Sequence, residues 1–283
     1  MIGGAHGGVV ERGGWRLNLA GEDSLEPGMR DAVVEAALEA AAGRGARLQR
    51  RSRRGSTYHL RTGGPAGAEF FIKIIDPVRG LEKLKQWFSG SRAEHIRAIS
   101  EAIRSEGLNA PPVVLWGRDR SSGRELVMTR RAPGVLATRY LRGAPTVDFA
   151  RKRIVLRALG AEIARLHLAG FIHGDLTPFN VIADDSPSIW FIDHERTRRA
   201  WLFRPARARL RNLVQLGRFG FPGLSRTDRM RVWSSYAAAT APARRRAELR
   251  RVSKMIAARI GRDGGFESSC ASPMPARGGL REL

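Results

Sequence analysis

Short extended segments and helical patterns alternate along the first half of the chain. Residues 46–75 contain the runs ARLQRRS, STYHLRT and EFFIKII, separated by glycine-containing turns, and this pattern predicts a meander of antiparallel strands. Residues 29–43 carry good helix formers and end at a glycine, which predicts a helix with a glycine stop. Residues 91–107 place isoleucines at spacings of three and four, as one face of an amphipathic helix does.

Helical patterns dominate the second half. Two prolines at 111 and 112 end the preceding helix, and VVLWG and RELVMTR then predict two more strands. Residues 147–169 predict a long helix closed by a glycine, and VIA and IWFI predict short strands around a DDSPS turn. Further helices are expected near 206–217, 225–240 and 242–260. Because the sheet comes first and the helices follow, we expect an α+β fold with a cleft between two lobes.

The length of the chain agrees with one domain of two lobes. It has 283 residues, of which 42% are hydrophobic, a size near which one core divides. We expect a small antiparallel-sheet N-lobe with one key helix over residues 15–131 and a mainly helical C-lobe over residues 132–263. The glycine-rich residues 1–14 and the Gly/Ser/Pro-rich residues 264–283 are expected to be loose tails.

Cysteine content and apolar runs indicate a compartment. The single cysteine, Cys270, can form neither an intrachain disulfide nor a cysteine-rich metal cluster, which agrees with a reducing cytoplasm. The first fifteen residues lack the charged start and apolar core of a signal peptide. Elsewhere no apolar run approaches the roughly 20 residues that span a bilayer. We therefore expect a soluble or peripheral cytoplasmic protein.

Positive charge is concentrated in the C-terminal quarter. The whole chain carries 50 Lys and Arg against 27 Asp and Glu, a formal net charge of +23. Residues 196–262 hold 19 basic residues and two acidic ones, a local net charge of +17. Clustered charge of one sign attracts polyanions, so membrane phospholipid, an anionic glycolipid or, less favoured, nucleic acid is the expected partner. A merely solvated arginine-rich face is the alternative.

Residues 171–195, FIHGDLTPFNVIADDSPSIWFIDHE, carry the clearest chemical pattern. Asp175 and Asn180 lie five positions apart in a loop after the long helix, and Asp193 ends a strand after a hairpin. Phosphoryl transfer needs an oriented hydroxyl and a neutralised triphosphate. We expect Asp175 to be the catalytic base, and Asn180 and Asp193 to bind the magnesium that bridges the phosphates of ATP. His173 is expected to support the loop by hydrogen bonding. Ordinary loop polarity, or a protein of this fold without catalysis, is the alternative.

Lys73 lies inside the apolar run EFFIKII, on the same strand face as Phe71 and Ile75. An ammonium removed from water needs an anion, and the expected partners are the α- and β-phosphates of ATP and a carboxylate from the following helix. Glu94, early in that helix, is the first candidate, and Glu101 is the second. The alternative is a lysine at a sheet edge whose ammonium reaches back to water.

The phosphate-covering loop is incomplete. RRSRRGSTYHL contains Gly55 at its turn but no full GxGxxG pattern. Backbone contact with phosphate at Gly55 is therefore expected to be less close than in a full glycine-rich loop, or to be aided by Arg53, Arg54 and Ser56. Met128, in the strand RELVMTR, is a further candidate for the nucleotide site.

These residues resemble the lipopolysaccharide kinase (Kdo/WaaP) family, relatives of protein kinases that phosphorylate inner-core sugars of lipopolysaccharide. Lys73 and the segments HGDLTPFN and FIDHERTRR carry the resemblance, which covers about residues 46–220. It implies a bilobal protein-kinase-like fold, ATP and Mg²⁺ as cofactors, and the roles given above to the lysine, the two aspartates and the asparagine. His194 and Glu195 stand where protein kinases have Phe-Gly, and no APE-like segment follows, so control by a long activation segment is not expected.

The resemblance also implies the acceptor, a heptose or Kdo hydroxyl on a lipid-anchored core that still faces the cytoplasm. The basic residues 196–262 agree with such a glycolipid and with a peripheral position on the inner face of the cytoplasmic membrane. Trp201 and Phe203, among these arginines, are expected at the level of the lipid headgroups, with packing inside the helical lobe as the alternative.

Two other functions stay open. A kinase acting on a protein or a small molecule, such as the kinase of tRNA-modification complexes or an aminoglycoside phosphotransferase, has a similar HGDLT segment, although the positive charge argues against cationic aminoglycosides. A catalytically silent module that binds nucleic acid or membrane would show a steep salt dependence and no ATP turnover.

Overall fold

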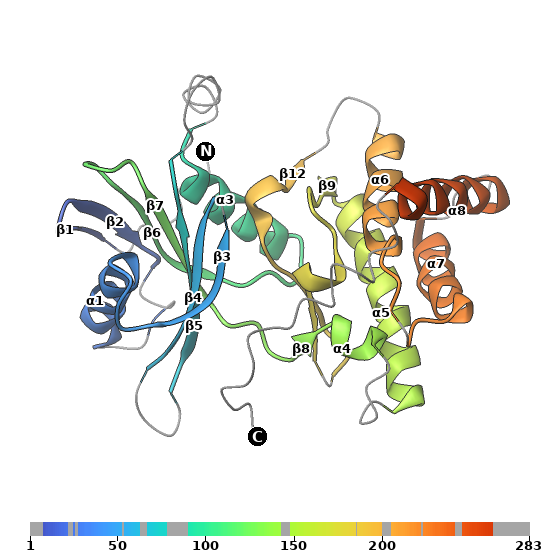
Figure 1. Ribbon diagram of the computed structural model, residues 1–283, viewed down its shortest axis with the longest axis horizontal. Helices are drawn as coiled ribbons and strands as arrows, with labels where there is room; N and C mark the ends of the chain where they lie inside the picture. The colour runs from blue at the N-terminus through green and yellow to red at the C-terminus, as the bar shows by residue number, and fades with distance from the viewer. Residues whose placement is uncertain are drawn as a thin grey trace. The chain divides into compact units, whose positions relative to one another are not determined.

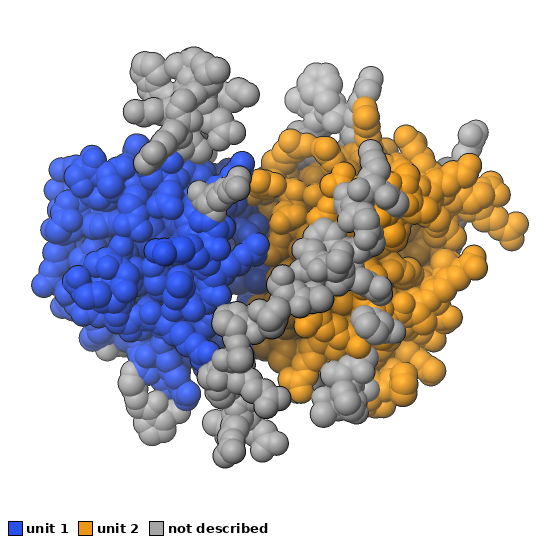
Figure 2. Space-filling model, viewed as in Figure 1, with its two compact units in different colours: residues 1–133, 190–195 blue, residues 134–189, 196–283 orange. Residues whose placement is uncertain are grey.

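The computed structural model describes residues 8–21, 25, 28–52, 54–62, 67–77, 90–142, 148–184, 186–199, 205–221, 223–240 and 245–262. The chain forms two compact units (Figure 2). Unit 1 comprises Met1–Pro133 and Trp190–Glu195, and unit 2 comprises Gly134–Ile189 and Arg196–Leu283. Four residues named above, together with the tail 264–283, lie outside the described residues: Arg53, Trp201, Phe203 and Cys270.

Unit 1 is built on a seven-stranded antiparallel sheet of order β1-β2-β6-β7-β5-β4-β3 (Figure 1). Its strands are β1 (Val9–Arg12), β2 (Trp15–Leu19), β3 (Arg47–Ser52), β4 (Gly55–Arg61), β5 (Glu69–Ile75), β6 (Val113–Asp119) and β7 (Glu125–Arg130). The meander expected over residues 46–75 is β3, β4 and β5, and the two strands expected after it are β6 and β7.

The expectation of a loose tail over residues 1–14 is wrong for β1. Residues 9–12 pair with β2 along its whole length, from Val9 opposite Asn18 to Arg12 opposite Trp15. The glycines that suggested a tail, Gly13 and Gly14, both have positive φ and form the tight turn that joins the two strands, which is a conformation that glycine adopts without steric cost.

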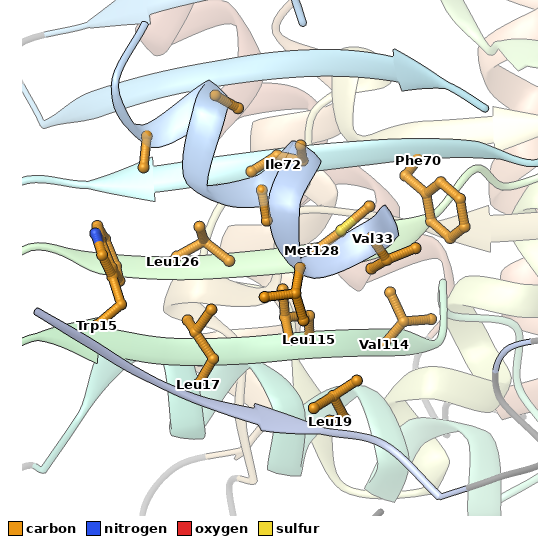
Figure 3. Packing of buried hydrophobic residues seen from close by; sticks show 14 of the residues in the cluster. Trp15, Leu17, Leu19, Val33, Phe70, Ile72, Val114, Leu115, Leu126 and Met128 are labelled. Atoms are coloured by element: carbon orange, nitrogen blue, oxygen red, sulfur yellow. The ribbon is translucent and has the colours of Figure 1, made fainter. Parts of the chain in front are cut away.

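One face of the sheet is covered by α1 (Met29–Ala41), which ends just before Gly43, as the glycine stop predicted. The helix turns a stripe of small side chains, including Val33 and Ala37, toward the sheet. Their size lets the helix lie close to Leu115 and Met128 (Figure 3). Burying a Val, Leu or Met side chain contributes roughly 1.5–3 kcal/mol, so this cluster is the main hydrophobic core of unit 1.

The opposite face of the sheet is covered by α3 (Arg92–Ser105), which begins at Ser91, whose hydroxyl accepts a hydrogen bond from the Glu94 N–H. The cluster between α3 and the sheet comprises Ile75, Ala93, Ile96, Val113, Trp116 and Val127. Lys73 lies on this same face, because it is paired with Val127 across β5 and β7 and directly opposed residues share a face.

Unit 2 is mainly helical. Its helices are α4 (Thr138–Leu141), α5 (Phe149–Leu168), α6 (Pro205–Gly217), α7 (Arg226–Thr240) and α8 (Arg245–Arg262). α5 packs along α7, and α6 packs against α8 (Figure 1). A buried ion pair between Lys152 and Asp228, with 2.6 Å between the charged atoms, joins α5 to α7.

Short ladders hold the segment that carries the chemical motif. β9 (Phe171–Ile172) pairs with β12 (Arg198–Arg199), and β10 (Val181–Ala183) pairs with β8 (Val135–Leu136). A turn closed by a hydrogen bond from the Asp184 N–H to the Ser188 carbonyl leads into β11 (Ile189–Phe191). The loop that begins at His173 is thus fixed at both of its ends.

These elements confirm the α+β class, with an antiparallel sheet and its helices in unit 1 and a mainly helical unit 2. The helices expected from the sequence are all present with ends that differ by a few residues. None of the described helices is both long and apolar enough to cross a bilayer.

Candidate active site

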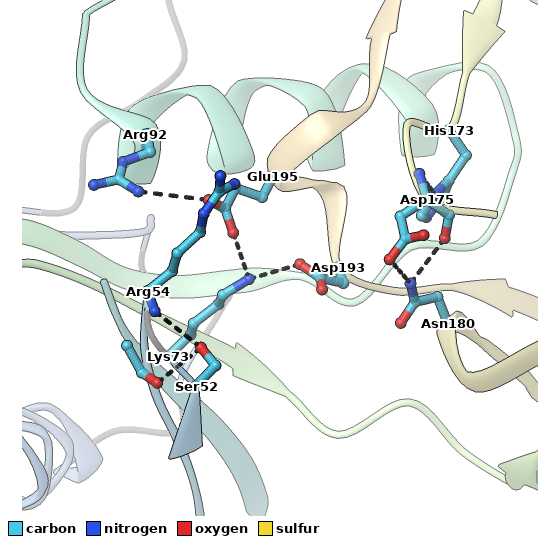
Figure 4. A network of polar contacts seen from close by, with 10 residues as sticks. Ser52, Arg54, Lys73, Arg92, His173, Asp175, Asn180, Asp193 and Glu195 are labelled. Carbon is cyan, nitrogen blue, oxygen red and sulfur yellow. Dashed lines mark hydrogen bonds and ion pairs between the residues drawn. The ribbon is translucent and has the colours of Figure 1, made fainter. Parts of the chain in front are cut away.

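Unit 1 brings Lys73 together with two carboxylates. The Lys73 Nζ lies 2.7 Å from Asp193 Oδ1 and 2.9 Å from Glu195 Oε2 (Figure 4). Lys73 comes from the middle of β5, and Glu195 lies in a short 3-10 turn, His194–Arg196, that follows β11. The structure therefore places Lys73 beside Asp193, one of the two expected metal ligands.

Electrostatics keep these groups charged. Burial by itself lowers the pKa of Lys73, but the charges of Asp193 and Glu195 outweigh burial and raise that pKa above its ordinary value. Burial raises the pKa of Glu195, yet the Lys73 ammonium outweighs it and the pKa is lowered. Arg92, 3.6 Å from the other carboxylate oxygen, acts in the same direction. Lys73 is thus a positioned cation at neutral pH.

The backbone of Asp193 has an unusual conformation. Its φ is +64°, and it is the non-glycine residue with positive φ among the described residues. Aspartate tolerates this left-handed region better than most side chains do, and strained backbone of this kind is concentrated at functional sites. The side chain is 40% exposed, so its carboxylate can reach both Lys73 and a ligand from solvent.

The prediction that Glu94 of α3 pairs with Lys73 is wrong. Both carboxylate oxygens of Glu94 are held elsewhere, one by the Arg97 guanidinium at 2.6 Å and the other by the Trp116 indole N–H at 2.6 Å. The second candidate, Glu101, also pairs with Arg97. Glu195 supplies the carboxylate instead. Its signal in the sequence was its place two residues after Asp193, where protein kinases have glycine.

The turn between β3 and β4 differs from the expected phosphate loop. Gly55 begins β4 in close contact with β5, because a Cβ at this position would lie 1.9 Å from the Ile74 carbonyl oxygen. Ser56 is paired with Ile74, so by strand alternation its side chain lies on the sheet face opposite to Lys73. The hydroxyl at this turn is that of Ser52, which donates to the Gly55 carbonyl and accepts from the Arg54 N–H (Figure 4).

Met128 is a core residue and not a nucleotide contact. It is fully buried in the cluster beneath α1 and is paired with Ile72. Because Lys73 is the next residue along β5, its side chain points to the other face of the sheet. The residue that shares the face of Lys73 on this strand is Val127.

Unit 2 brings the expected base and the second expected metal ligand together. The Asn180 amide nitrogen donates to the Asp175 carbonyl at 2.8 Å and to its carboxylate at 3.3 Å (Figure 4). The turn itself is closed by the Thr177 N–H to the Asp175 carbonyl and by the Asn180 N–H to the Thr177 carbonyl. Five residues of chain are therefore enough to orient both side chains.

A buried network beneath this loop was not predicted. His173 is fully buried, and its Nδ1 accepts from the Asp175 N–H at 3.3 Å, which agrees with its expected supporting role. Asn212 of α6 binds the backbone of His173 through both its carbonyl and its amide group. His167 of α5 lies 3.2 Å from the same Asn212 carbonyl oxygen. An asparagine in an arginine-rich helix gives no sequence signal for this role.

This network predicts a pH dependence of stability. Burial lowers the pKa of His167 from its ordinary value to about 4, so the unfolded chain binds a proton that the folded chain does not. The stability that neutral His167 contributes is complete above about pH 6.5 and decreases as the pH falls toward 4. Urea unfolding at pH 7 and pH 5 should show a loss of about 2 kcal/mol attributable to this residue.

His167→Gln tests that assignment. The variant should lose less stability than the wild type between pH 7 and pH 5, because glutamine does not titrate. His95→Gln, in α3 of unit 1, serves as the control and should keep the wild-type dependence. Parallel curves for wild type and His167→Gln would show that another group is responsible.

Each unit exposes an oxygen of a kind that magnesium prefers. In unit 2, Asn180 presents its amide oxygen away from Asp175, because its nitrogen makes both bonds (Figure 4). In unit 1, Asp193 offers a half-exposed carboxylate.

A sheet-based unit with a lysine–aspartate pair and a helical unit with an Asp-x4-Asn loop are the parts of a protein-kinase-like phosphotransferase. Within that class, the sequence model of the lipopolysaccharide kinase (Kdo/WaaP) family matches residues 89–236, more than half of the chain. The chain therefore belongs to the lipopolysaccharide kinase (Kdo/WaaP) family, as its motifs suggested.

Individual relatives are more distant. A stretch of 41 residues is 42% identical to the 3-deoxy-D-manno-octulosonic acid kinase of Vibrio parahaemolyticus serotype O3:K6 (strain RIMD 2210633), and it covers 14% of this chain and 17% of that protein. The structure of vaccinia related kinase 3 has a TM-score of 0.36 and 14% identity, over 70% of this chain and 53% of that one.

Proposed function

We propose that this protein transfers the γ-phosphoryl group of ATP to a heptose or Kdo hydroxyl of the lipopolysaccharide inner core. The observation that carries the proposal is the Lys73–Asp193 ion pair in a chain of the Kdo/WaaP family. Ammonium and carboxylate at this spacing suit a metal-bound triphosphate. The name of the Vibrio relative, a Kdo kinase, supports a sugar as the acceptor.

Each residue has a role in the proposed reaction. Lys73 contacts the α- and β-phosphates, and Asn180 and Asp193 supply the oxygens for magnesium, which neutralises phosphate charge when bound. The acceptor oxygen attacks the γ-phosphorus while Asp175 takes its proton, and ADP leaves. The proposal requires that the pair in unit 1 and the pair in unit 2 act on the same nucleotide.

The proposed place of action is the inner face of the cytoplasmic membrane, where a lipid-anchored core would be within reach. The net charge of +17 over residues 196–262 supports this position, because clustered basic residues near a membrane are attracted to its anionic lipid headgroups. The same charge would draw an inner-core glycolipid, whose phosphates and carboxylates are anionic at neutral pH.

A comparison of acceptors tests the proposal. The protein is incubated with magnesium and ATP labelled at the γ-phosphate, and lipopolysaccharide core, a generic protein and tRNA are offered in parallel. We expect label in the core fraction. Label on the protein or the tRNA, with none on the core, would show that the acceptor is not a core sugar. Label on none of the three would favour a catalytically silent protein that binds anions.

Glu195 should matter for ATP use where Glu94 does not. Glu195→Gln removes one of the two charges that hold the Lys73 ammonium, so Lys73 loses its fixed position. We expect the KM for ATP to rise about 10-fold, with a smaller change in kcat, in steady-state assays with the acceptor saturating.

Glu94→Gln is the matched control, since it removes the same charge from the α3 side of the sheet. Glu94 is bonded to Arg97 and Trp116, so its replacement should leave the KM for ATP within about 2-fold. Equal effects of the two variants, or a larger one at Glu94, would contradict the assignment of Glu195.

A further inference from the structure

A cavity of about 1160 Å³ lies in unit 2, bounded by α6, α8 and the β9–β12 ladder. Six arginines line it: Arg196, Arg198, Arg207, Arg211, Arg218 and Arg259. Among its lining residues, all in the described part of the chain, there is no aspartate or glutamate. Its size suits a bound molecule larger than a single phosphate or sugar.

Helical spacing explains why the arginines face one cavity. Arg207, Arg211 and Gln215 recur every four residues along α6, and Arg218 follows three residues later. Residues with this spacing share one face of a helix. α8 packs against α6 and contributes Arg259, so the cavity is the product of two helices and a short ladder.

Charge and shape together favour an anionic ligand. Guanidinium groups of like sign repel one another, and in a concave site their fields add and concentrate anions. Arg207 and Arg211 are exposed, so their charged ends are accessible to a ligand. The planar guanidinium binds phosphate and carboxylate through two parallel hydrogen bonds, which favours a ligand with several such groups.

One wall of the cavity is the catalytic loop itself. Gly174, the residue before Asp175, lines the cavity, and its carbonyl accepts from the Gln215 side chain at 3.1 Å. The chain is tightly packed there, because a Cβ on Gly174 would lie 2.2 Å from the Arg196 carbonyl oxygen. A molecule held in this cavity is therefore beside the loop that carries Asp175.

We infer that this cavity binds a carbohydrate headgroup that carries at least two phosphate or carboxylate groups. That the ligand is a carbohydrate, and that it is the acceptor held for Asp175, rests on the proposed function, whereas the binding of a molecule with several anionic groups rests on the arginines of the cavity. None of the described lining residues is aromatic, so the cavity lacks the stacking platform with which proteins bind single-stranded nucleic acid.

Binding without ATP tests the inference. The probe is deacylated lipopolysaccharide inner core, which retains its phosphates and carboxylates but has no lipid, titrated calorimetrically into the protein. Arg207→Gln combined with Arg211→Gln should weaken its Kd by about 10- to 100-fold, since two charge-assisted contacts are lost. The double change to lysine keeps the charge but removes the paired hydrogen bonds, and it should give an intermediate loss.

Arg250→Gln combined with Arg251→Gln is the matched control. Both side chains are exposed on α8 and outside the cavity, so the net charge falls equally while the Kd should stay within about 3-fold. Equal weakening in the two double variants would overturn the inference, because it would show attraction by net charge alone. Unchanged binding in the cavity variant would also overturn it.

Further binding measurements show which part of the ligand the cavity recognises. Phosphatase-treated core should bind more weakly, and core presented in vesicles should depend on the same two arginines. Pyrophosphate and a DNA duplex are titrated in the same way. If either binds as tightly as the core, and this binding is lost in the Arg207/Arg211 variant, the ligand is not specifically a sugar headgroup and the inference is wrong.

The two proposals can fail separately. Core binding that persists in Asp175→Asn without phosphoryl transfer to any acceptor by the wild type would leave the cavity assignment intact and reject the kinase. Transfer to the core with an unchanged KM in the Arg207/Arg211 variant would leave the kinase intact and reject the cavity.

Discussion

Asp175→Asn should lower the rate of phosphoryl transfer to the acceptor by about 10²- to 10⁴-fold, the usual contribution of a positioned general base. Asparagine keeps the shape of the side chain, and the Asn180 amide can still bond to the backbone carbonyl of residue 175. What the variant loses is the ability to accept the proton of the attacking hydroxyl. Single-turnover assays with labelled ATP and lipopolysaccharide core measure this rate.

Asp148→Asn provides a control with the same change of charge in unit 2. Asp148 accepts from two N–H groups at the start of α5, and asparagine is an equally good residue at such a position, so both rate and stability should stay close to wild type. Thermal unfolding of Asp175→Asn should also be unchanged. If the transfer rate of Asp175→Asn is within about 10-fold of the wild-type rate, Asp175 is not the general base.

Lys152→Met should destabilise the protein by about 3 kcal/mol, the lower end of the range for breaking a buried ion pair. Lys152 and Asp228 are each 7% exposed, and their charged atoms lie 2.6 Å apart. Methionine fills the space but leaves the Asp228 carboxylate without its ammonium. Arg231 and Ser225 still bond to it, which limits the loss. Urea unfolding followed by tryptophan fluorescence measures the change.

Arg165→Met is the matched control on the same helix. Its pairing with Glu162 is half-exposed and closes one turn of α5, and such pairs contribute less than about 1 kcal/mol. Similar losses in the two variants would show that the Lys152–Asp228 pair has no special role in joining α5 to α7.

The contribution of the Lys152–Asp228 pair to stability should decrease at low pH. Burial raises the pKa of Asp228, but hydrogen bonds from Lys152 and Ser225 outweigh it and lower that pKa to about 2. Its contribution to stability is therefore complete above about pH 3.8 and is lost as the pH falls toward 2. The difference in stability between wild type and Lys152→Met should shrink over that interval.

The proximity of Asp175 and Asn180 in one loop was predictable because its geometry is local. Asp175 and Asn180 are separated by a single turn, and hydrogen bonds within that turn orient both side chains. The same holds for helix ends, such as the one before Gly43, where a few neighbouring residues decide the conformation. Residue types and spacing along the chain therefore carried enough information.

The incorrect predictions of site residues have a common cause, which is that contacts across the fold decide where a side chain points. Ser56 was chosen for its place beside the turn glycine, and Met128 for its strand, but strand register decides which face a side chain occupies. Their pairing with Ile74 and Ile72 places both on the face opposite to Lys73. Glu94 was chosen by helix position, yet Arg97 and Trp116 hold its carboxylate.

By itself, the sequence determined the order of strands and helices, because periodicity and turn residues are properties of neighbouring residues. Its short motifs indicated Lys73, Asp175, Asn180 and Asp193 as candidate site residues. Tertiary structure alone decided that Glu195, 122 residues along the chain from Lys73, is its second carboxylate. It also gathered arginines from α6, α8 and β12 around one cavity. Contacts between residues so far apart depend on how the elements pack, which no local pattern records.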